Sequence, residues 1–428
     1  MMKIKHSLLF AICFVILSPA HAQSIRVSKE RKLNLGLDGK ILVENHLTVN
    51  PKDSTHLFLS GMFVDSKNSS HYGNYAIQSR DNGNSWTHLK FFDIPEGADP
   101  WGLITKKGTI LSTVLGLDNL FLFRSENEGE KWIEKPIDLG TAHDHQTMIE
   151  DRTRNRIYIV SIQGNSIYVN YSLDDGKTFN NVNRFVFSNL SSNTMTPVLL
   201  SDGTLMVSFT TFNRPAINGT RQGGKAERLK QNLSWTVPYT VEKGFGTPLF
   251  LSEACETGFP VLANNLNATA YGDYLYYVCS SQTEKSIMFH YSNTKGKSWT
   301  AGKPISTFTN SEKSKRNPFT GMPQVTINNK GVIGVIWQGR TETTKSACQY
   351  LYFTASLDGG KSFMKPVKVS SKQSCMERKE NDWAGKRYKS GGDYTGFVSD
   401  RKGNFIVIWP DSRNGISKLY SAKIKVNK

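Results

Sequence analysis

The eight residues Ser79-Arg80-Asp81-Asn82-Gly83-Asn84-Ser85-Trp86 follow the pattern Ser-x-Asp-x-Gly-x-Ser/Thr-aromatic. The same pattern returns at 172–179 and at 356–363. Three copies of this length in one chain indicate an internal repeat rather than chance. A period of roughly 50 residues is typical of propellers, in which each repeat forms one four-stranded blade.

Weaker copies occur between the three clear ones. Their residues are 125–132, 228–235 and 292–299, with Asn127 and Thr294 at the Asp position of the first and last. The six starting positions are then separated by 46, 47, 56, 64 and 64 residues. This spacing predicts one blade for each copy.

The residue types of the pattern have a structural purpose. An Asp carboxylate accepts hydrogen bonds from the N–H groups of a turn, Gly supplies a positive φ, and the aromatic ring packs beneath the sheet. A calcium loop is not expected, because Asp174-Asp175-Gly176 lacks the alternating ligands and the Glu at position 12 of such loops. We therefore expect no metal and no cofactor, and the pattern itself predicts hairpins rather than catalysis.

The pattern resembles the Asp-box, or BNR, repeat, and the chain is similar to the sialidase-like superfamily of β-propellers over nearly all of its length. The resemblance implies an all-β fold with a single propeller, in which each box lies between the third and fourth strands of a blade. Short β-rich runs precede the boxes, such as Tyr75-Ala76-Ile77-Gln78. The sequence is consistent with that placement.

The end of the chain predicts how the ring closes. After the last box, three strand-like runs remain at 392–398, 404–409 and 418–425, so the last blade lacks a fourth strand. The N-terminal runs 25–28 and 32–35 can each supply it. Six blades with boxes and one shared blade give seven, with six as the alternative if the copy at 228–235 is not a box.

The first 22 residues have the features of a cleaved secretory signal. Lys3 and Lys5 are followed by an apolar stretch from Leu8 to Leu17 and by small residues up to Ala22. That stretch is too short to span a bilayer, and no later segment is long enough to do so. We expect a signal peptide at 1–22, a propeller domain at 23–428 and a secreted or periplasmic protein.

The cysteines fit an exported protein. Once Cys13 leaves with the signal, four remain, and an even number in an exported chain favours disulfides. In the expected blades, Cys255 begins a first strand and Cys279 ends the second, whereas Cys348 begins a third strand and Cys375 follows the fourth. The predicted pairs are therefore Cys255–Cys279 and Cys348–Cys375.

The chain is strongly basic, with a formal charge of +17 that becomes +15 when Lys3 and Lys5 are removed. A positive field attracts polyanions such as acidic glycans, anionic lipids or nucleic acid. No recognised nucleic-acid-binding motif is present. The partner that we expect is a glycan or glycoconjugate, and the positive charge favours an anionic one.

The boxes also predict which face is functional. If they form the turns between third and fourth strands, the connections between second and third strands and between blades lie on the opposite face, which most propellers use. By resemblance to sialidases, Asp99 is expected to be the acid/base, Tyr394 the nucleophile and Glu256 the residue that activates it. The substrate-binding arginines would be Arg214, Arg340 and Arg413, because guanidinium groups bind carboxylates in a bidentate manner.

Other polar and aromatic residues are expected on that face. The further substrate-binding candidates are Trp101, His143, His145 and Asp393. On a regular strand the imidazoles of His143 and His145 would point the same way, and they could act as base and acid in a propeller lyase. Asp411 and Arg413 alternate onto one side of a strand, which predicts an internal salt bridge between them.

The resemblance has one departure, because sialidases carry an Arg-Ile-Pro triplet in the first blade and this chain has none. We therefore expect a sialidase-like exo-glycosidase that hydrolyses terminal sugars, with acidic sugars as the favoured class, and two alternatives remain. One is a non-catalytic glycan-binding propeller with Trp101 and Trp383 as exposed platforms. The other is a polysaccharide lyase that depends on His143 or His145.

Overall fold

The computed structural model describes most of the chain after the expected signal at 1–22. The described residues are 23–141, 143–180, 183–187, 190–194, 196–215, 233–253, 255, 257–264, 266, 271–281, 284–306, 320–339, 348–375, 388 and 391–427. Within them, the side chains of 190–192, 212–215, 257–260 and 320 are left aside. Every element in these ranges is a strand, and none is a helix able to cross a membrane.

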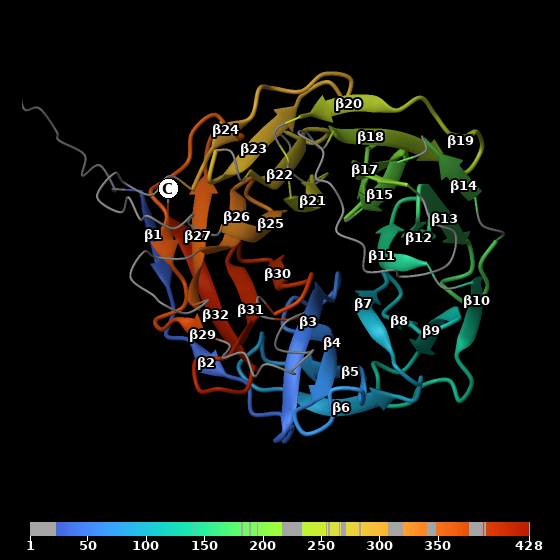
Figure 1. The fold of residues 1–428 in the computed structure, drawn as a ribbon, viewed down its shortest axis with the longest axis vertical. Helices are drawn as coiled ribbons and strands as arrows, with labels where there is room; N and C mark the ends of the chain where they lie inside the picture. Colours follow the sequence, from blue (N-terminus) through green and yellow to red (C-terminus); the bar gives the residue numbers. More distant parts are fainter. Residues whose placement is uncertain are drawn as a thin grey trace, which may run out of the picture.

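The strands form seven antiparallel sheets arranged as blades around a central axis (Figure 1). Each blade has four principal strands that follow one another from the axis outward, and short extra strands extend three of the sheets. The predicted all-β propeller with seven blades is thus confirmed, and the alternative with six blades is wrong.

The first three blades contain four strands each. Blade 1 has β3 (Lys40–Val49), β4 (Leu57–Asp65), β5 (Tyr72–Ser79) and β6 (Thr87–Phe92). Blade 2 has β7 (Ala98–Ile104), β8 (Ile110–Leu115), β9 (Asn119–Ser125) and β10 (Ile137–Thr141). Blade 3 has β11 (Asp144–Asp151), β12 (Arg156–Gln163), β13 (Ser166–Ser172) and β14 (Asn183–Val186).

The next three blades include the short extra strands. Blade 4 has β15 (Leu190–Thr194), β16 (Val198–Leu199), β17 (Leu205–Pro215), β18 (Leu233–Thr240), β19 (Gly244–Phe245) and β20 (Leu249–Ser252). Blade 5 has β21 (Thr257–Ala263), β22 (Leu275–Ser281), β23 (Ser286–Ser292) and β24 (Lys303–Pro304). Blade 6 has β25 (Thr320–Ile327), β26 (Ile333–Gly339), β27 (Cys348–Ser356), β28 (Val367–Lys368) and β29 (Ser374–Cys375).

Blade 7 joins the two ends of the chain, as predicted. Its members are β30 (Gly396–Ser399), β31 (Phe405–Asp411), β32 (Lys418–Asn427), β1 (Ser24–Val27) and β2 (Arg31–Lys32). Both N-terminal strands pair antiparallel with β32, β1 near its end and β2 near its start. Of the two closing runs that the sequence offers, the chain therefore uses both in succession.

The repeated pattern forms the turn between the third and fourth strands of five blades. In blade 3, the Asp174 carboxylate accepts hydrogen bonds from the N–H groups of Lys177 and Thr178 at 3.1 and 2.9 Å and from the hydroxyls of Ser172 and Thr178. Gly176 has a φ of 79°, the left-handed region that favours glycine. The same turn recurs with Asn127 and Thr294 as acceptors in blades 2 and 5.

These turns also join neighbouring blades. The Phe363 ring of blade 6 lies 4.7 Å from the Phe289 ring of blade 5, and Trp132 of blade 2 lies 5.3 Å from Phe92 of blade 1. Each aromatic residue thus packs against the preceding blade, where it adds to the apolar core between the sheets.

The sixth copy of the pattern, predicted at 228–235, is wrong. Its last two residues, Ser234 and Trp235, lie inside the third strand β18, opposite Thr210 and Phe209 of β17. The corresponding turn of blade 4 follows Thr240, where no copy of the pattern occurs. Blade 4 forms although it lacks this turn, because its strands pair with one another and bury apolar side chains.

Both predicted disulfides are present. Cys255 is bonded to Cys279 with Cα atoms 5.5 Å apart, and Cys348 is bonded to Cys375 with Cα atoms 4.2 Å apart. The first joins the beginning of blade 5 to its second strand, and the second joins β27 to β29. Each closes a loop within one blade.

The turns predict a specific response to substitution and to acid. Burial opposes ionisation of Asp174, but the hydrogen bonds from Thr178 and Ser172 outweigh it and lower its pKa to about 2. Because this value lies below the ordinary 3.8, ionised Asp174 stabilises the fold above pH 4, and the contribution disappears as the pH falls towards 2. Asp174→Ala should lower the free energy of unfolding at pH 7 by about 1–2 kcal/mol, measured by urea denaturation.

Asp174→Asn separates the turn from its charge. Since Asn127 already fills this place in blade 2, the variant should keep the turn but lose stability less steeply than the wild type between pH 4 and pH 2. Asp118→Asn, at an exposed aspartate outside the repeated turns, is the control. Parallel acid curves for the wild type and Asp174→Asn would contradict the assignment.

Candidate functional site

The innermost strands of several blades are interrupted by a β-bulge. Register shifts occur in β3, β7, β11, β21 and β25. Four residues at these bulges have positive φ without being glycine, namely Glu44 (44°), Asp99 (47°), His145 (54°) and Met322 (50°). Such backbone is strained, and bulges redirect the side chains that they carry. A bulge near the start of successive inner strands brings polar side chains together at one mouth of the central pore.

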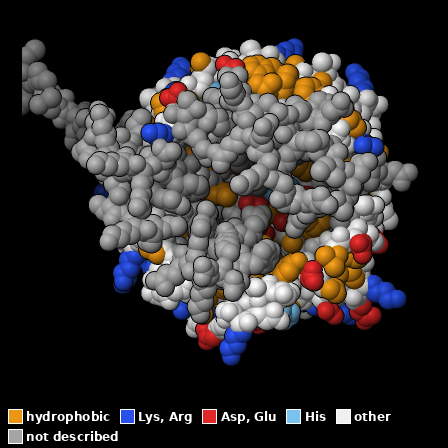
Figure 2. Space-filling view, viewed as in Figure 1, with side chains coloured by type: hydrophobic (Ala, Val, Ile, Leu, Met, Phe, Trp, Pro, Cys, Tyr) orange, Lys and Arg blue, Asp and Glu red, His pale blue; other side chains and the backbone are white. Residues whose placement is uncertain are grey.

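Asp99 is the centre of this group. Its carboxylate accepts a hydrogen bond from the backbone N–H of His145 at 3.0 Å, and its main-chain carbonyl accepts one from the Gln146 side-chain amide. The side chain of Asp144 is hydrogen-bonded to that of Asp99. Acidic side chains are visible in the hollow at the centre of the ring (Figure 2). The bulges of blades 2 and 3 therefore hold two carboxyl groups in direct contact.

The two carboxyl groups have different surroundings. Asp99 is only 6% exposed, whereas the Asp144 side chain is 48% exposed. Burial raises the pKa of Asp99 well above its ordinary value, and the nearby charges of Asp144, Glu44 and Asp393 raise it further. Asp99 consequently keeps its proton at a pH where aspartate is ordinarily ionised.

Tyr394 meets the same group from blade 7. Its hydroxyl lies 3.1 Å from Nδ1 of His145, with which it shares a hydrogen bond. The residue is 2% exposed, and burial together with Asp99, Glu44 and Asp393 raises its pKa well above the ordinary 10. Tyr394 is therefore a neutral phenol with a histidine nitrogen in place to exchange its proton.

His143 and His145 make different contacts, and the expectation that they point the same way is not met. The His143 ring stacks on Tyr168 at 3.8 Å, and its Nδ1 lies 3.4 Å from the Ser161 hydroxyl. Burial lowers the pKa of His143 to about 4. The bulge between Asp144 and Thr147 breaks the alternation on which the expectation depended.

Trp101 and Asp393 are buried beside this group. Trp101 is 5% exposed, stacks against His46 with ring centroids 3.7 Å apart, and donates its indole N–H to the Met148 carbonyl. Its ring also meets Tyr394 edge-on at 5.7 Å. It is thus not the exposed platform that the glycan-binding alternative requires, and Trp383 lies outside the described residues.

The expected arginines are not assembled in the described part of the chain. Arg413 is buried between Asp411 and Glu30, with which it forms salt bridges, and lies 4.3 Å from the Tyr420 ring. The predicted Asp411–Arg413 salt bridge is confirmed. Arg340, Glu256 and the side chain of Arg214 lie outside the described residues.

Glu44 and Asp144 belong to this site, although the sequence reasoning did not select them. Glu44-Asn45-His46 interrupts the apolar run from Ile41 to Val49. Asp99-Pro100 and Asp144-His145-Gln146 lie in the first residues of the equivalent inner strands β7 and β11. Polar residues within otherwise apolar inner strands, recurring from one blade to the next, are the sequence feature from which the bulges could have been predicted.

No protein-family model matches the chain, and no curated protein matches it in sequence. Among solved structures, it is similar to a PL25 polysaccharide lyase, an ulvan lyase, with TM-score 0.53, 11% identity and coverage of 89% of this chain and 94% of that one. A protein of unknown function from Dyadobacter fermentans DSM 18053 has TM-score 0.49, 10% identity and coverage of 94% and 99%. The NanB sialidase of Streptococcus pneumoniae has TM-score 0.45, 12% identity and coverage of 94% and 70%. What the lyase shares with this chain, at such low identity, is the propeller fold.

Proposed function

We propose that this protein is a secreted glycoside hydrolase that cleaves glycans at the pore mouth formed by blades 7, 1, 2 and 3. The observation that carries the proposal is the convergence of three side chains from different blades. Tyr394 shares a hydrogen bond with His145, and the backbone N–H of His145 donates to Asp99. Glycosidases that use a Tyr nucleophile combine it with a carboxylic acid and a group that activates the phenol.

Asp99 supplies the acid in this scheme. A buried carboxyl group that stays protonated beside a more exposed one is the usual arrangement for protonating a leaving group. Asp99 gives its proton to the glycosidic oxygen as the bond to the anomeric carbon breaks. The side chain of Asp144, which is half-exposed and lies beside Asp99, stabilises the positive charge that develops on the sugar ring.

Tyr394 supplies the nucleophile. Burial disfavours its phenolate, so attack on the anomeric carbon requires removal of the phenol proton, and Nδ1 of His145 lies 3.1 Å from the hydroxyl to accept it. Water assisted by ionised Asp99 then releases the sugar from Tyr394, and the proton returns from His145 to the phenol. This scheme retains the sialidase-type roles of Asp99 and Tyr394 and replaces the expected glutamate by His145.

A second candidate function, β-elimination by a polysaccharide lyase, is favoured by the same Tyr394–His145 pair. One member removes the proton beside a uronate carboxyl group, and the other protonates the leaving oxygen. The product then carries a new double bond that absorbs ultraviolet light. Hydrolysis is the better supported of the two because it gives each of the three converging groups, the protonated Asp99 as well as Tyr394 and His145, a defined step.

Turnover distinguishes the two candidates. The wild type should release chromophore from aryl glycosides without forming an unsaturated sugar, and Asp99→Asn should lower kcat by about 10²–10⁴-fold because the acid is lost. Tyr394→Phe should be impaired to a similar extent, whereas Asp118→Asn should match the wild type. Ultraviolet-absorbing products from uronate polysaccharides, with aryl glycosides untouched, would favour the lyase instead.

Stability provides an independent check on Asp99. Because its pKa is raised in the folded protein, the folded state holds a proton that the unfolded chain releases above about pH 4, so the wild type loses stability as the pH rises. Asp99→Asn still accepts the His145 N–H but does not titrate. Its melting temperature should exceed that of the wild type at pH 7, and the difference should vanish below pH 4.

A structural role for Asp99 predicts the reverse. If ionised Asp99 stabilised the fold, Asp99→Asn would melt below the wild type at pH 7. Asp174→Asn is the matched control, since its carboxylate has a lowered pKa and its replacement should not raise stability at neutral pH.

A further inference from the structure

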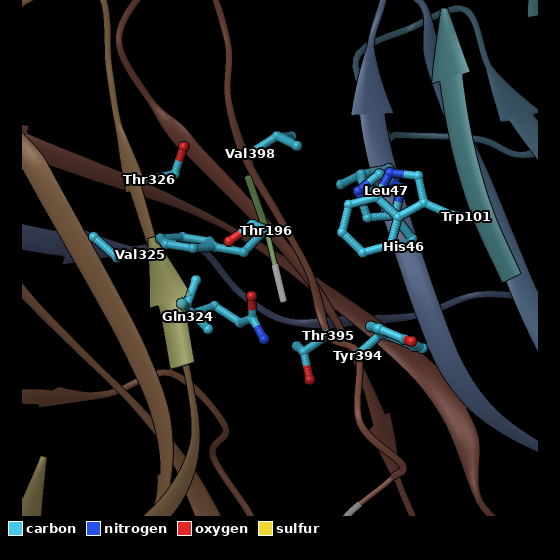
Figure 3. Close-up of a pocket in the computed structure, with 12 residues that line it drawn as sticks. His46, Leu47, Trp101, Thr196, Gln324, Val325, Thr326, Tyr394, Thr395 and Val398 are labelled. Atoms are coloured by element: carbon cyan, nitrogen blue, oxygen red, sulfur yellow. The ribbon is translucent and has the colours of Figure 1, made fainter. Parts of the chain in front are cut away.

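A cavity of about 190 Å³ lies at the centre of the ring, next to the proposed reaction centre. Tyr394 and Trp101 line the cavity and also belong to the reaction centre or adjoin it. The hydroxyl of Tyr394 reaches His145, and Trp101 follows Asp99 by two residues. Residues of blades 1, 2, 5, 6 and 7 and the segment after β15 complete the lining (Figure 3). A sugar whose anomeric carbon reaches Tyr394 can therefore place its ring in this cavity.

The lining combines a flat aromatic wall with uncharged polar groups. His46 stacked on Trp101 forms one wall, and the side chains of Gln324 and Thr395 lie on the other side of the cavity (Figure 3). The Thr196 hydroxyl is already bonded to the Leu262 backbone, whereas the Gln324 amide has no hydrogen bond to another described residue. Aromatic faces and amides are the groups that bind the C–H faces and hydroxyls of sugars.

The described residues that line the cavity carry no formal charge. None of these twelve residues is Asp, Glu, Lys or Arg, and burial lowers the pKa of His46 to about 3, so its imidazole is neutral. Asp393 is the neighbour of Tyr394 in the chain and adds negative charge close by. A sugar carboxylate placed here would lose its hydration, and none of these described lining residues supplies a cation to replace it, which is costly.

The size of the cavity limits the occupant to one ring. A cavity of about 150 Å³ in a protein core holds one six-membered ring such as benzene, and one water takes about 30 Å³. The volume of about 190 Å³ therefore accommodates one monosaccharide with its hydroxyls and not two.

We propose that this cavity binds the terminal, uncharged monosaccharide of the glycan, so that the substrate is a neutral sugar and not a sialic or uronic acid. This inference rests on the proposed glycosidase function, since it assigns the substrate class of that site. The amide of Gln324 and the hydroxyl of Thr395 bind sugar hydroxyls, and the His46–Trp101 stack packs against the apolar face of the ring.

Binding is measured by isothermal titration and saturation-transfer NMR with the Asp99→Asn protein, in which turnover is blocked. The probes are the methyl glycosides of galactose, arabinose and N-acetylglucosamine, with glucuronic acid and N-acetylneuraminic acid as the charged comparison. At least one neutral glycoside should bind about tenfold more tightly than either acid. Gln324→Leu should weaken that binding about tenfold, and Thr395→Val should weaken it without altering the volume.

Gln163→Leu, at an exposed glutamine outside the cavity, is the matched control and should bind like its parent. Tighter binding of either acid, binding unchanged by both Gln324→Leu and Thr395→Val, or a cavity that binds no sugar would overturn the inference. Wild-type turnover separates it from the proposed function. If Asp99→Asn abolishes hydrolysis but Gln324→Leu and Thr395→Val leave sugar binding unchanged, only this inference fails. If these two variants weaken binding but Asp99→Asn leaves turnover unchanged, only the proposed reaction fails.

Discussion

The ring depends on the pairing of the two chain ends in blade 7. The C-terminal segment supplies β30, β31 and β32, and without β1 and β2 the outer edge of β32 would have unpaired N–H and C=O groups. Glu30, in the segment between β1 and β2, accepts a hydrogen bond from the backbone of Ser371 in blade 6 and binds Arg413 in blade 7. A residue near the N-terminus therefore joins the last two blades as well as closing the ring.

Closure matters for the site because its residues come from blades on both sides of the joint. Tyr394 belongs to blade 7, whereas Glu44, Asp99 and His145 belong to blades 1, 2 and 3. The hydrogen bond between Tyr394 and His145 spans 249 positions of the sequence and holds only while the ring is complete. The unfavourable burial of Asp99 and the strained φ of the bulge residues are maintained by this rigid frame, a common relation between stability and function.

The sequence predicts the features that depend on local chemistry. The turn pattern identified five of the seven blades, because this short turn requires a hydrogen-bond acceptor and a glycine at fixed positions, and these are recognisable in the sequence. Disulfide pairing followed from the strand register. Blade 4 was assigned through a copy of the pattern that the structure places inside β18, so the correct number of blades rested partly on a wrong element.

The candidate site was only partly predictable, because its geometry depends on bulges and on contacts between distant blades. Asp99, His145 and Tyr394 were expected on one face, and the structure brings them together. Neither their contact nor the presence of Glu44 and Asp144 beside them could be derived from alternation along a strand. Alternation also led to the wrong orientation for His143. From the sequence, Arg413 could equally bind the carboxylate of a substrate or form an internal ion pair. Its contacts with Glu30 and Asp411 show that it forms the internal ion pair.

The bulges have a consequence for how such a protein changes during evolution. Each lies within the ladder of its own blade and outside the repeated turns, so exchanging one side chain there leaves the strand pairing of the other blades intact. Positive φ strongly disfavours β-branched residues, whereas Gly, Asn, Asp and His adopt it more readily. The pore mouth is therefore a small set of bulge positions whose side chains can change while the strand pairing of each blade is kept, and through substitutions at these few places one scaffold can acquire a new reaction.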